Sequence, residues 1–232
     1  NPSLPYLSFL CINFDAPVVK EAASWFLGGV FLNYNSSYLE RALEQMLDEA
    51  DSPEVTRFLR AVDVRIDGFR VEKAPEGHGQ RVFVRHDVDG KGYELRLSEE
   101  SAGTQKLMGL AAFLLAALER GGTVVVDELD AKLHPKLLRY VILLFKDPEV
   151  NKHGAQLIFS SQDVSTMRND VFRRDEIWFA ARGEGEASQL WSLADIHEAN
   201  GNLVSKNAAF DKQYLSGRYG ADPYLTRIEE WD

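Results

Sequence analysis

The sequence of 232 residues predicts an α/β fold with a parallel sheet, a preceding helical segment and a short antiparallel β part. Three observations lead to this class. Residues 123–161 alternate strand, helix and strand, and such a unit places its two strands parallel and adjacent. Residues 62–97 alternate apolar and polar side chains, which is typical of antiparallel strands. Residues 17–62 carry apolar side chains at helical spacing.

The first part of the chain, residues 1–62, is predicted to be a helical segment. Its stretches "VVKEAASWFLGGVF" and "SSYLERALEQMLDEA" have apolar residues on one helical face. The stretch "SPEVTRFLRAV" begins a further helix with Ser52 as its N-cap and a proline at the first helical position, where no N–H is needed. We therefore expect consecutive helices over residues 17–62.

The remainder, residues 63–232, is predicted to form a second domain. It opens with three short antiparallel strands between Val62 and Leu97. The stretches that separate these strands, "APEGHGQ" and "DVDGKG", are rich in glycine and charge, as turns are. The antiparallel part therefore precedes the parallel one along the chain.

An apolar helix over residues 103–120 is predicted next, closed by the two glycines at 121–122. The strand–helix–strand unit of residues 123–161 follows it. Near the end of the chain, "EIWFAAR" and "SQLWSL" are predicted to pair as a hairpin, and "NAAFDKQYL" to form a last helix.

Composition narrows the class of protein. Hydrophobic residues make up 45% and charged residues 27% of the chain, which is ordinary for a globular domain. The net charge of −10 argues against a surface that is basic throughout, although a local basic patch remains compatible with it. No apolar run reaches the roughly 18 residues of a membrane span. The single cysteine, Cys11, cannot form an intrachain disulfide, so we expect a cytoplasmic protein with no membrane partner.

Carboxylates crowd the end of one predicted strand. The stretch "TVVVDELDAKLHP" leads from three valines directly into Asp127 and Glu128, with Asp130 two residues on. Stacked carboxylates repel one another unless a cation lies between them. A solvated loop is the alternative interpretation, and the neighbouring motifs must decide between the two.

Two further motifs are expected near these carboxylates. The stretch "LIFSSQD" ends the adjacent strand at the same carboxyl edge, where doubly wound sheets place their ligands. The stretch "LSEESAGTQKL" puts Ser101, Gly103 and Thr104 at the start of the long helix. A helix N-terminus offers free N–H groups and a positive dipole end to an anion. Taken alone, Ser101 could merely cap its helix.

The order of these motifs resembles the C-terminal lobe of ABC-type ATPases, in the branch that contains SMC, RecF and OLD-like proteins. "SEESAGTQKL" is similar to the ABC signature, and "TVVVDELDAKLHP" to the Walker B motif with the D-loop. "LIFSSQD" stands where that family reads "FTTHD", and the tail "YLSGRYGADPYL" is similar to the end of these ATPases. The resemblance covers roughly residues 63–225 and implies the P-loop NTPase type of fold.

The resemblance implies ATP and Mg²⁺ as cofactors. Asp127 would hold the magnesium ion, and Glu128 would orient and deprotonate the attacking water. Further residues would meet the nucleotide or the interface with a second copy of the chain across the ATP site. They are Ser101, Gly103, Thr104, Asp130 and His134.

Two departures from the family pattern affect the expected function. Gln162 replaces the switch histidine, and because glutamine cannot carry positive charge, slow hydrolysis or a nucleotide-dependent clamp is favoured. The sequence also contains no G-x-x-x-x-G-K-[ST] phosphate loop. We therefore expect the C-terminal part of a larger ATPase, with the missing Walker A half as a partner and residues 1–62 as the end of a helical insertion.

The resemblance suggests DNA transactions or anti-phage defence, with DNA or an effector protein such as a nuclease as partner. A non-hydrolysing, nucleotide-dependent scaffold for a partner protein is a second possibility. A DNA partner would contact three basic residues on one helix face, Lys132, Lys136 and Arg139. The alternative is that these residues form a solvated surface. The rival function is a metal-dependent nuclease with a carboxylate cluster. Its members would be Asp127, Glu128, Asp130 and Asp163.

Overall fold

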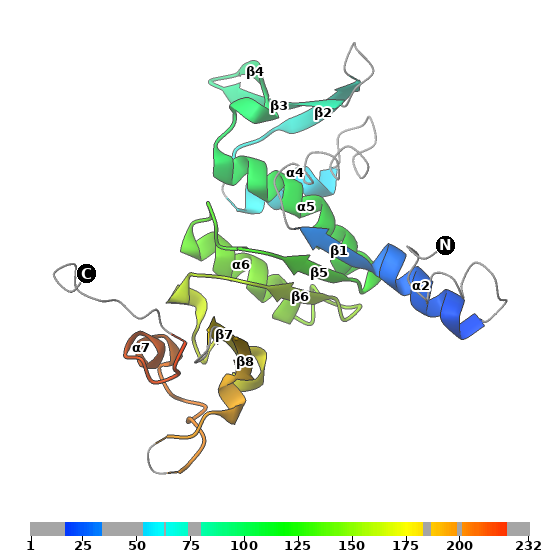
Figure 1. Cartoon of the computed structure of the whole chain (residues 1–232). Coiled ribbons are helices and arrows are strands. Elements are labelled where there is room, and N and C mark those ends of the chain that lie inside the picture. Colours follow the sequence, from blue (N-terminus) through cyan, green and yellow to red (C-terminus); the bar gives the residue numbers. More distant parts are fainter. Residues whose placement is uncertain are drawn as a thin grey trace. The chain divides into compact units, whose positions relative to one another are not determined.

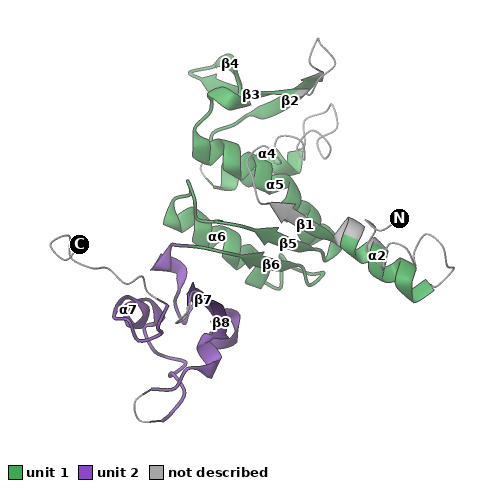
Figure 2. Cartoon of the chain, in the orientation of Figure 1, with its two compact units in different colours: residues 1–161 green, residues 162–232 purple. Residues whose placement is uncertain are grey.

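The computed structural model describes residues 17–33, 53–62, 64–73, 80–182, 187–198 and 201–221 (Figure 1). The chain divides into two compact units, residues 1–161 and residues 162–232 (Figure 2). Each unit is described by itself below. The predicted domain boundary at residue 62 remains a prediction.

A three-stranded parallel sheet carries the predicted site. Its strands are β1 (Val30–Asn33), β5 (Thr123–Val126) and β6 (Gln156–Phe159), in the order β1-β5-β6 (Figure 1). Thr123 pairs with Val30 on one side and with Gln156 on the other. The predicted parallel pairing of the strand–helix–strand unit is confirmed, and β5 is its central strand.

Strand β1 corrects the prediction that residues 17–62 are helical throughout. Helix α2 (Pro17–Gly29) occupies the expected position but ends at Gly29, and Val30–Asn33 pair with β5 instead. Paired glycines lower helix stability, and the backbone hydrogen bonds to β5 outweigh the local apolar spacing. Helix α4 (Pro53–Ala61) is confirmed. The helix predicted for "SSYLERALEQMLDEA" and the N-cap Ser52 lie outside the described residues.

Helix α5 (Ala102–Arg120) is the predicted long helix, and its first residue follows the N-cap Ser101. It ends as expected, because Gly121 adopts φ +75° and its N–H donates to the carbonyl of Ala117. A Cβ at position 121 would also lie 2.4 Å from the carbonyl oxygen of His153, so glycine is needed there for two reasons. Helix α6 (Pro135–Lys146) connects β5 to β6 and buries one apolar face.

The antiparallel part is a three-stranded sheet of β2 (Gly68–Lys73), β3 (Gln80–Val88) and β4 (Lys91–Arg96), as predicted between residues 62 and 97. The β3–β4 hairpin turns at Asp89 and Gly90, whose φ angles are +54° and +77°. An Asp-Gly pair is favoured in such a two-residue turn. A 3₁₀ turn, η1 (Leu97–Glu99), leads from β4 towards α5.

The core of the first unit is formed by α5 together with the elements that pack against it. Helix α5 buries eleven residues, which explains why its sequence is apolar on most of its circumference. Helix α4 contributes its own buried face to this core. The fully buried side chains of largest volume here are Phe69, Leu59, Ile66, Leu107, Met108, Leu110, Leu114, Leu129 and Leu138.

The second unit contains the predicted hairpin, β7 (Trp178–Arg182) paired with β8 (Ser188–Ser192). It also contains α7 (Phe210–Leu215), which is shorter than the predicted "NAAFDKQYL" helix, and the 3₁₀ turns η2 (Val164–Thr166), η3 (Arg174–Glu176) and η4 (Leu193–Asp195). Aromatic side chains form much of the core of this unit. The ring of Phe179 stacks on Tyr214 at 5.7 Å and lies 5.3 Å from Tyr219.

Within the part of the chain that the structure describes, no helix is both long and apolar enough to span a membrane.

Candidate functional site

The carboxyl ends of β5 and β6 are joined by a network of hydrogen bonds around one serine. Ser160 follows β6, and its hydroxyl donates to the carboxylate oxygen Oδ1 of Asp127, which follows β5. The Ser160 hydroxyl oxygen also accepts the backbone N–H of Glu128 at 2.7 Å. The Leu129 N–H donates to the Ser160 carbonyl at 3.0 Å. These contacts bring the two predicted strand ends together and fix the direction of the exposed Asp127 carboxylate.

Glu128 has an unusual main-chain conformation. Its φ of +50° lies in the left-handed region, which is uncommon for a residue with a side chain and concentrates at functional sites. Its carbonyl oxygen accepts two hydrogen bonds, one from the Ala131 N–H at 3.0 Å and one from the Lys106 Nζ at 2.5 Å. Both peptide groups that flank Glu128 are therefore fixed, and its carboxylate is exposed.

Lys106 is a component of the site that sequence reasoning missed. Burial lowers the pKa of its ammonium group, and the nearby carboxylates of Asp130 and Glu128 oppose that shift. A signal was present in the sequence, because Lys106 follows Gly103 by one helical turn and the two residues share a helix face. Its target, however, is a main-chain oxygen that no motif specifies.

The start of α5 lies against the loop that follows β5. Ser101 caps the helix, with its Oγ accepting the Thr104 N–H at 3.1 Å, and the two hydroxyl oxygens are 2.8 Å apart. A Cβ on Gly103 would lie 2.8 Å from the carbonyl oxygen of Lys132. Only glycine allows this approach without a backbone shift. Ser101 thus caps α5, which was the alternative to a phosphate-binding role in the sequence analysis. Gly103 lies beside the loop of residues 127–134.

That loop is anchored at both ends. Leu129 is fully buried, and Lys132 has a φ of +65°. Asp130 is partly buried and its carbonyl accepts the Leu133 N–H at 2.9 Å. At the other end, His134 caps α6, because its Nδ1 accepts the Lys136 N–H at 3.1 Å. The predicted roles of Asp130 and His134 at a dimer interface remain predictions.

Gln162 and Asp163 belong to the second unit, in which Gln162 is the first residue. The Asp163 carboxylate caps η2 by accepting the Ser165 N–H at 2.7 Å and the Ser165 hydroxyl at 2.6 Å. The structure therefore gives Asp163 a local structural role. Over the described residues, no three His, Cys, Asp or Glu side chains group as a metal site, so the cluster that a nuclease requires is not found there. The switch role of Gln162 remains a prediction.

The residues at the strand ends fit part of a magnesium–ATP site. An exposed carboxylate directed by a serine hydroxyl supplies the hard oxygen ligand that Mg²⁺ prefers. The N-terminus of the 19-residue helix α5 suits a phosphate oxygen. A phosphate loop is not among the motifs of the sequence, so these residues supply one part of such a site.

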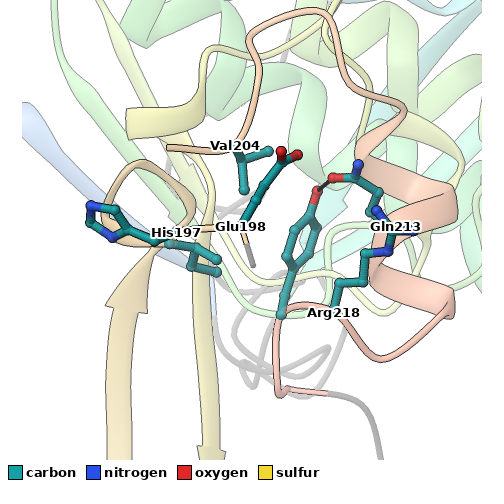
Figure 3. A pocket seen from close by; sticks show the side chains of 7 residues that line it. His197, Glu198, Val204, Gln213 and Arg218 are labelled. Carbon is teal, nitrogen blue, oxygen red and sulfur yellow. Dashed lines mark hydrogen bonds between the residues drawn. The ribbon is translucent and has the colours of Figure 1, made fainter. Parts of the chain in front are cut away.

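A pocket of about 460 Å³ in the second unit contains none of the predicted site residues (Figure 3). Its wall includes His197, Glu198 and Arg218, and the Tyr219 hydroxyl donates to the Gln213 side chain at 2.7 Å. Burial raises the pKa of Tyr219 to about 12. Tyr219 also belongs to the apolar core of this unit. The "GRYG" stretch of the tail motif therefore has a structural role.

Comparison with known proteins identifies the family. The family model described as "AAA domain, putative AbiEii toxin, Type IV TA system" matches residues 12–168, which is more than half of the chain. Among solved structures, the chain is similar to the crystal structure of the Smc head domain with a coiled coil and joint from Pyrococcus yayanosii. That similarity has 16% sequence identity and a TM-score of 0.41, and it covers 71% of this chain and 28% of that chain. A search of curated proteins gives no match. The family match confirms the predicted resemblance to an ATPase of this class, and the chain belongs to this AAA-domain family.

Proposed function

We propose that the chain is the signature-bearing lobe of an ABC-type ATPase that dimerises around ATP and Mg²⁺. The observation that carries this proposal is the hydrogen-bonded junction of the β5 and β6 ends, in which one serine hydroxyl contacts both Asp127 and Glu128. A solvated loop would not need this arrangement. Membership of the AAA-domain family supports nucleotide chemistry at the junction.

In this proposal Asp127 and Glu128 have different roles in catalysis. Asp127 supplies a carboxylate oxygen to Mg²⁺, and the bound ion would offset negative charge on the phosphates. Glu128 accepts a proton from the attacking water as a general base. The hydrogen bond from the Ser160 hydroxyl would orient the Asp127 carboxylate as the magnesium ligand.

The α5 N-terminus serves the nucleotide of a second copy of the chain. Ser101, Gly103 and Thr104 would meet its γ-phosphate with hydroxyl and main-chain N–H groups. The loop from Asp130 to His134, which lies beside Gly103 at Lys132, would cross the interface between the copies. In the second unit, Gln162 would offer the γ-phosphate a hydrogen bond without a charge, which favours slow turnover.

In this proposal the phosphate loop belongs to a Walker A half outside this sequence. Among the described residues, β6 is paired on the β5 side only, and its Ile158 is 56% exposed. An open strand edge with exposed apolar side chains is normally covered in a native assembly. We propose that the Walker A half contributes a strand at this edge. DNA or an effector protein as further partner, and a setting in DNA transactions or phage defence, rest on the family resemblance.

Substitution of Glu128 in the full-length protein tests this function. Glu128→Gln keeps the size of the side chain and removes the base, so ATP turnover should fall by about 10²–10⁴-fold while ATP binding persists. Glu149→Gln is the matched control, because Glu149 is an exposed glutamate in the turn after α6. Steady-state phosphate release at saturating ATP and Mg²⁺ is the measurement. Turnover within about threefold of wild type would show that Glu128 is not the base.

A further inference from the structure

We infer that Lys106 is a positioning residue for Glu128, holding the main chain of the proposed base in its left-handed conformation through the Glu128 carbonyl oxygen. The inference rests on the proposed function and assigns to that site a residue from the first turns of α5. The hydrogen bond of Lys106 goes to the Glu128 carbonyl oxygen, so Lys106 orients the base and takes no part in proton transfer.

The conformation of Glu128 needs support from its neighbours. A φ of +50° places the Cβ of an L-residue close to its own backbone, and such residues persist only where surrounding contacts hold them. Three contacts do so here. Ser160 Oγ accepts the Glu128 N–H at 2.7 Å, and the Glu128 carbonyl accepts the Ala131 N–H at 3.0 Å and the Lys106 Nζ at 2.5 Å.

Lys106 supplies the only one of these three contacts that comes from a helix. Ser160 and Ala131 belong to the segments that follow β6 and β5. Lys106 instead projects from α5, a 19-residue helix that packs in the core of the first unit. It therefore ties the base to a rigid element, and a site built on such elements holds its geometry better than one built on loops.

The environment of the ammonium group favours a specific role over a solvated one. Lys106 is partly buried, and burial lowers its pKa. Removing an ammonium group from water is unfavourable unless it is hydrogen-bonded and near opposite charge. The Glu128 carbonyl provides the hydrogen bond, and the Asp130 and Glu128 carboxylates provide the charge. One turn earlier, Gly103 lets α5 approach the loop closely enough for this contact.

The inference predicts a loss of catalytic rate with little loss of ATP affinity. In Lys106→Met the side chain keeps its length but cannot hydrogen-bond, so Glu128 is free to relax toward an ordinary φ and its carboxylate moves. Displacement of a catalytic group by about 1 Å can cost roughly 10²-fold. We expect kcat to fall at least about tenfold and KM for ATP to change by less than about twofold. Lys106→Arg, which retains a charged donor, should recover much of the rate.

The experiment uses the full-length protein with Lys106→Met, Lys106→Arg and the control Lys152→Met, whose lysine is exposed in the turn before β6. Each variant is also made in the Glu128→Gln background. If Lys106 acts through Glu128, Lys106→Met should change residual turnover by less than about twofold in that background. A second readout follows assembly in place of phosphate release: with ATP and Mg²⁺, Lys106→Met should accumulate the ATP-bound dimer in light scattering, whereas Lys152→Met should not.

Several results would overturn the inference. Lys106→Met could match Lys152→Met in kcat, or could lower turnover by the same factor with and without Glu128. If Lys106→Met melts below the assay temperature, the shorter and uncharged Lys106→Gln takes its place, and unfolding of both would mean a purely structural role. Failure of the proposed function gives a different pattern, because Glu128→Gln itself would then leave turnover unchanged.

Discussion

At the scale of single residues, Ser160 contacts both members of the Asp127–Glu128 pair. Its hydroxyl donates to Asp127 and accepts from the Glu128 N–H, so one side chain uses both its donor and an acceptor lone pair. A hydrogen bond to a carboxylate is stronger than one between neutral groups. Ser160 therefore directs the Asp127 carboxylate and helps to hold the Glu128 main chain.

Ser160→Ala should weaken the proposed magnesium site. The substitution removes the donor to Asp127 and the acceptor for the Glu128 N–H, and loss of a hydrogen bond to a metal-ligating group typically costs about 10–100-fold in metal affinity. We expect the Mg²⁺ concentration that half-saturates ATP turnover to rise by about that factor in the full-length protein. Ser188→Ala, at an exposed serine of β8, is the control. Equal Mg²⁺ requirements in the two variants would remove Ser160 from the site.

At the scale of elements, the close approach of α5 to the loop after β5 gives the site its shape. The approach is possible because position 103 has no Cβ, and it brings both Gly103 and Lys106 to the loop from one helix face. Ser101 satisfies the Thr104 N–H at the same helix end. The helix start is therefore fixed before any ligand arrives.

Gly103→Ala should displace this loop. Its new Cβ would lie 2.8 Å from the Lys132 carbonyl oxygen, a backbone atom that cannot move alone. Overpacking of this kind costs typically about 1–3 kcal/mol. Urea unfolding should show that loss, and ATP turnover should fall with it. Gly92→Ala is the matched control, since a Cβ there meets no atom within 4 Å. Equal free energies of unfolding for the two variants would show that the contact is not tight.

Local sequence patterns predicted most of these elements. The signals for α5 were a cap at Ser101 and a glycine at 121, and those for the β3–β4 hairpin were alternation and an Asp-Gly turn. The strand β1 was missed, because residues 30–33 pair with residues 123–126 across a long stretch of chain. Apolar spacing over a few residues cannot distinguish a helix end from a strand that is stabilised by a distant partner.

The candidate site was also predictable only in part. Asp127, Ser101 and Gly103 stand in recognisable motifs, and the parallel pairing of β5 with β6 places Ser160 beside Asp127. The contact that Lys106 makes was not predictable, because its partner is the main-chain carbonyl of Glu128, a residue with a φ of +50°. A sequence shows which side chains are present, whereas the main-chain conformation at a strand end depends on the folded structure.

At the scale of the whole molecule, the proposal requires two copies. The strand-end residues Asp127 and Glu128 would act on one nucleotide, while the α5 N-terminus, with Ser101, would complete the site of the other copy. Both surfaces lie in the first unit. The second unit has its own aromatic core around Phe179 and Tyr219. It begins with Gln162, for which we propose a hydrogen bond to the γ-phosphate.

ATP-dependent dimerisation of the full-length Glu128→Gln protein tests this account most directly. Slow hydrolysis should trap the nucleotide-bound state, so the molar mass from size-exclusion chromatography with light scattering should double when ATP and Mg²⁺ are added. Adding Ser101→Arg should abolish the doubling and preserve ATP binding, because position 101 would meet only the nucleotide of the other copy. A mass that does not respond to ATP, or one that still doubles with Ser101→Arg, would contradict the shared site.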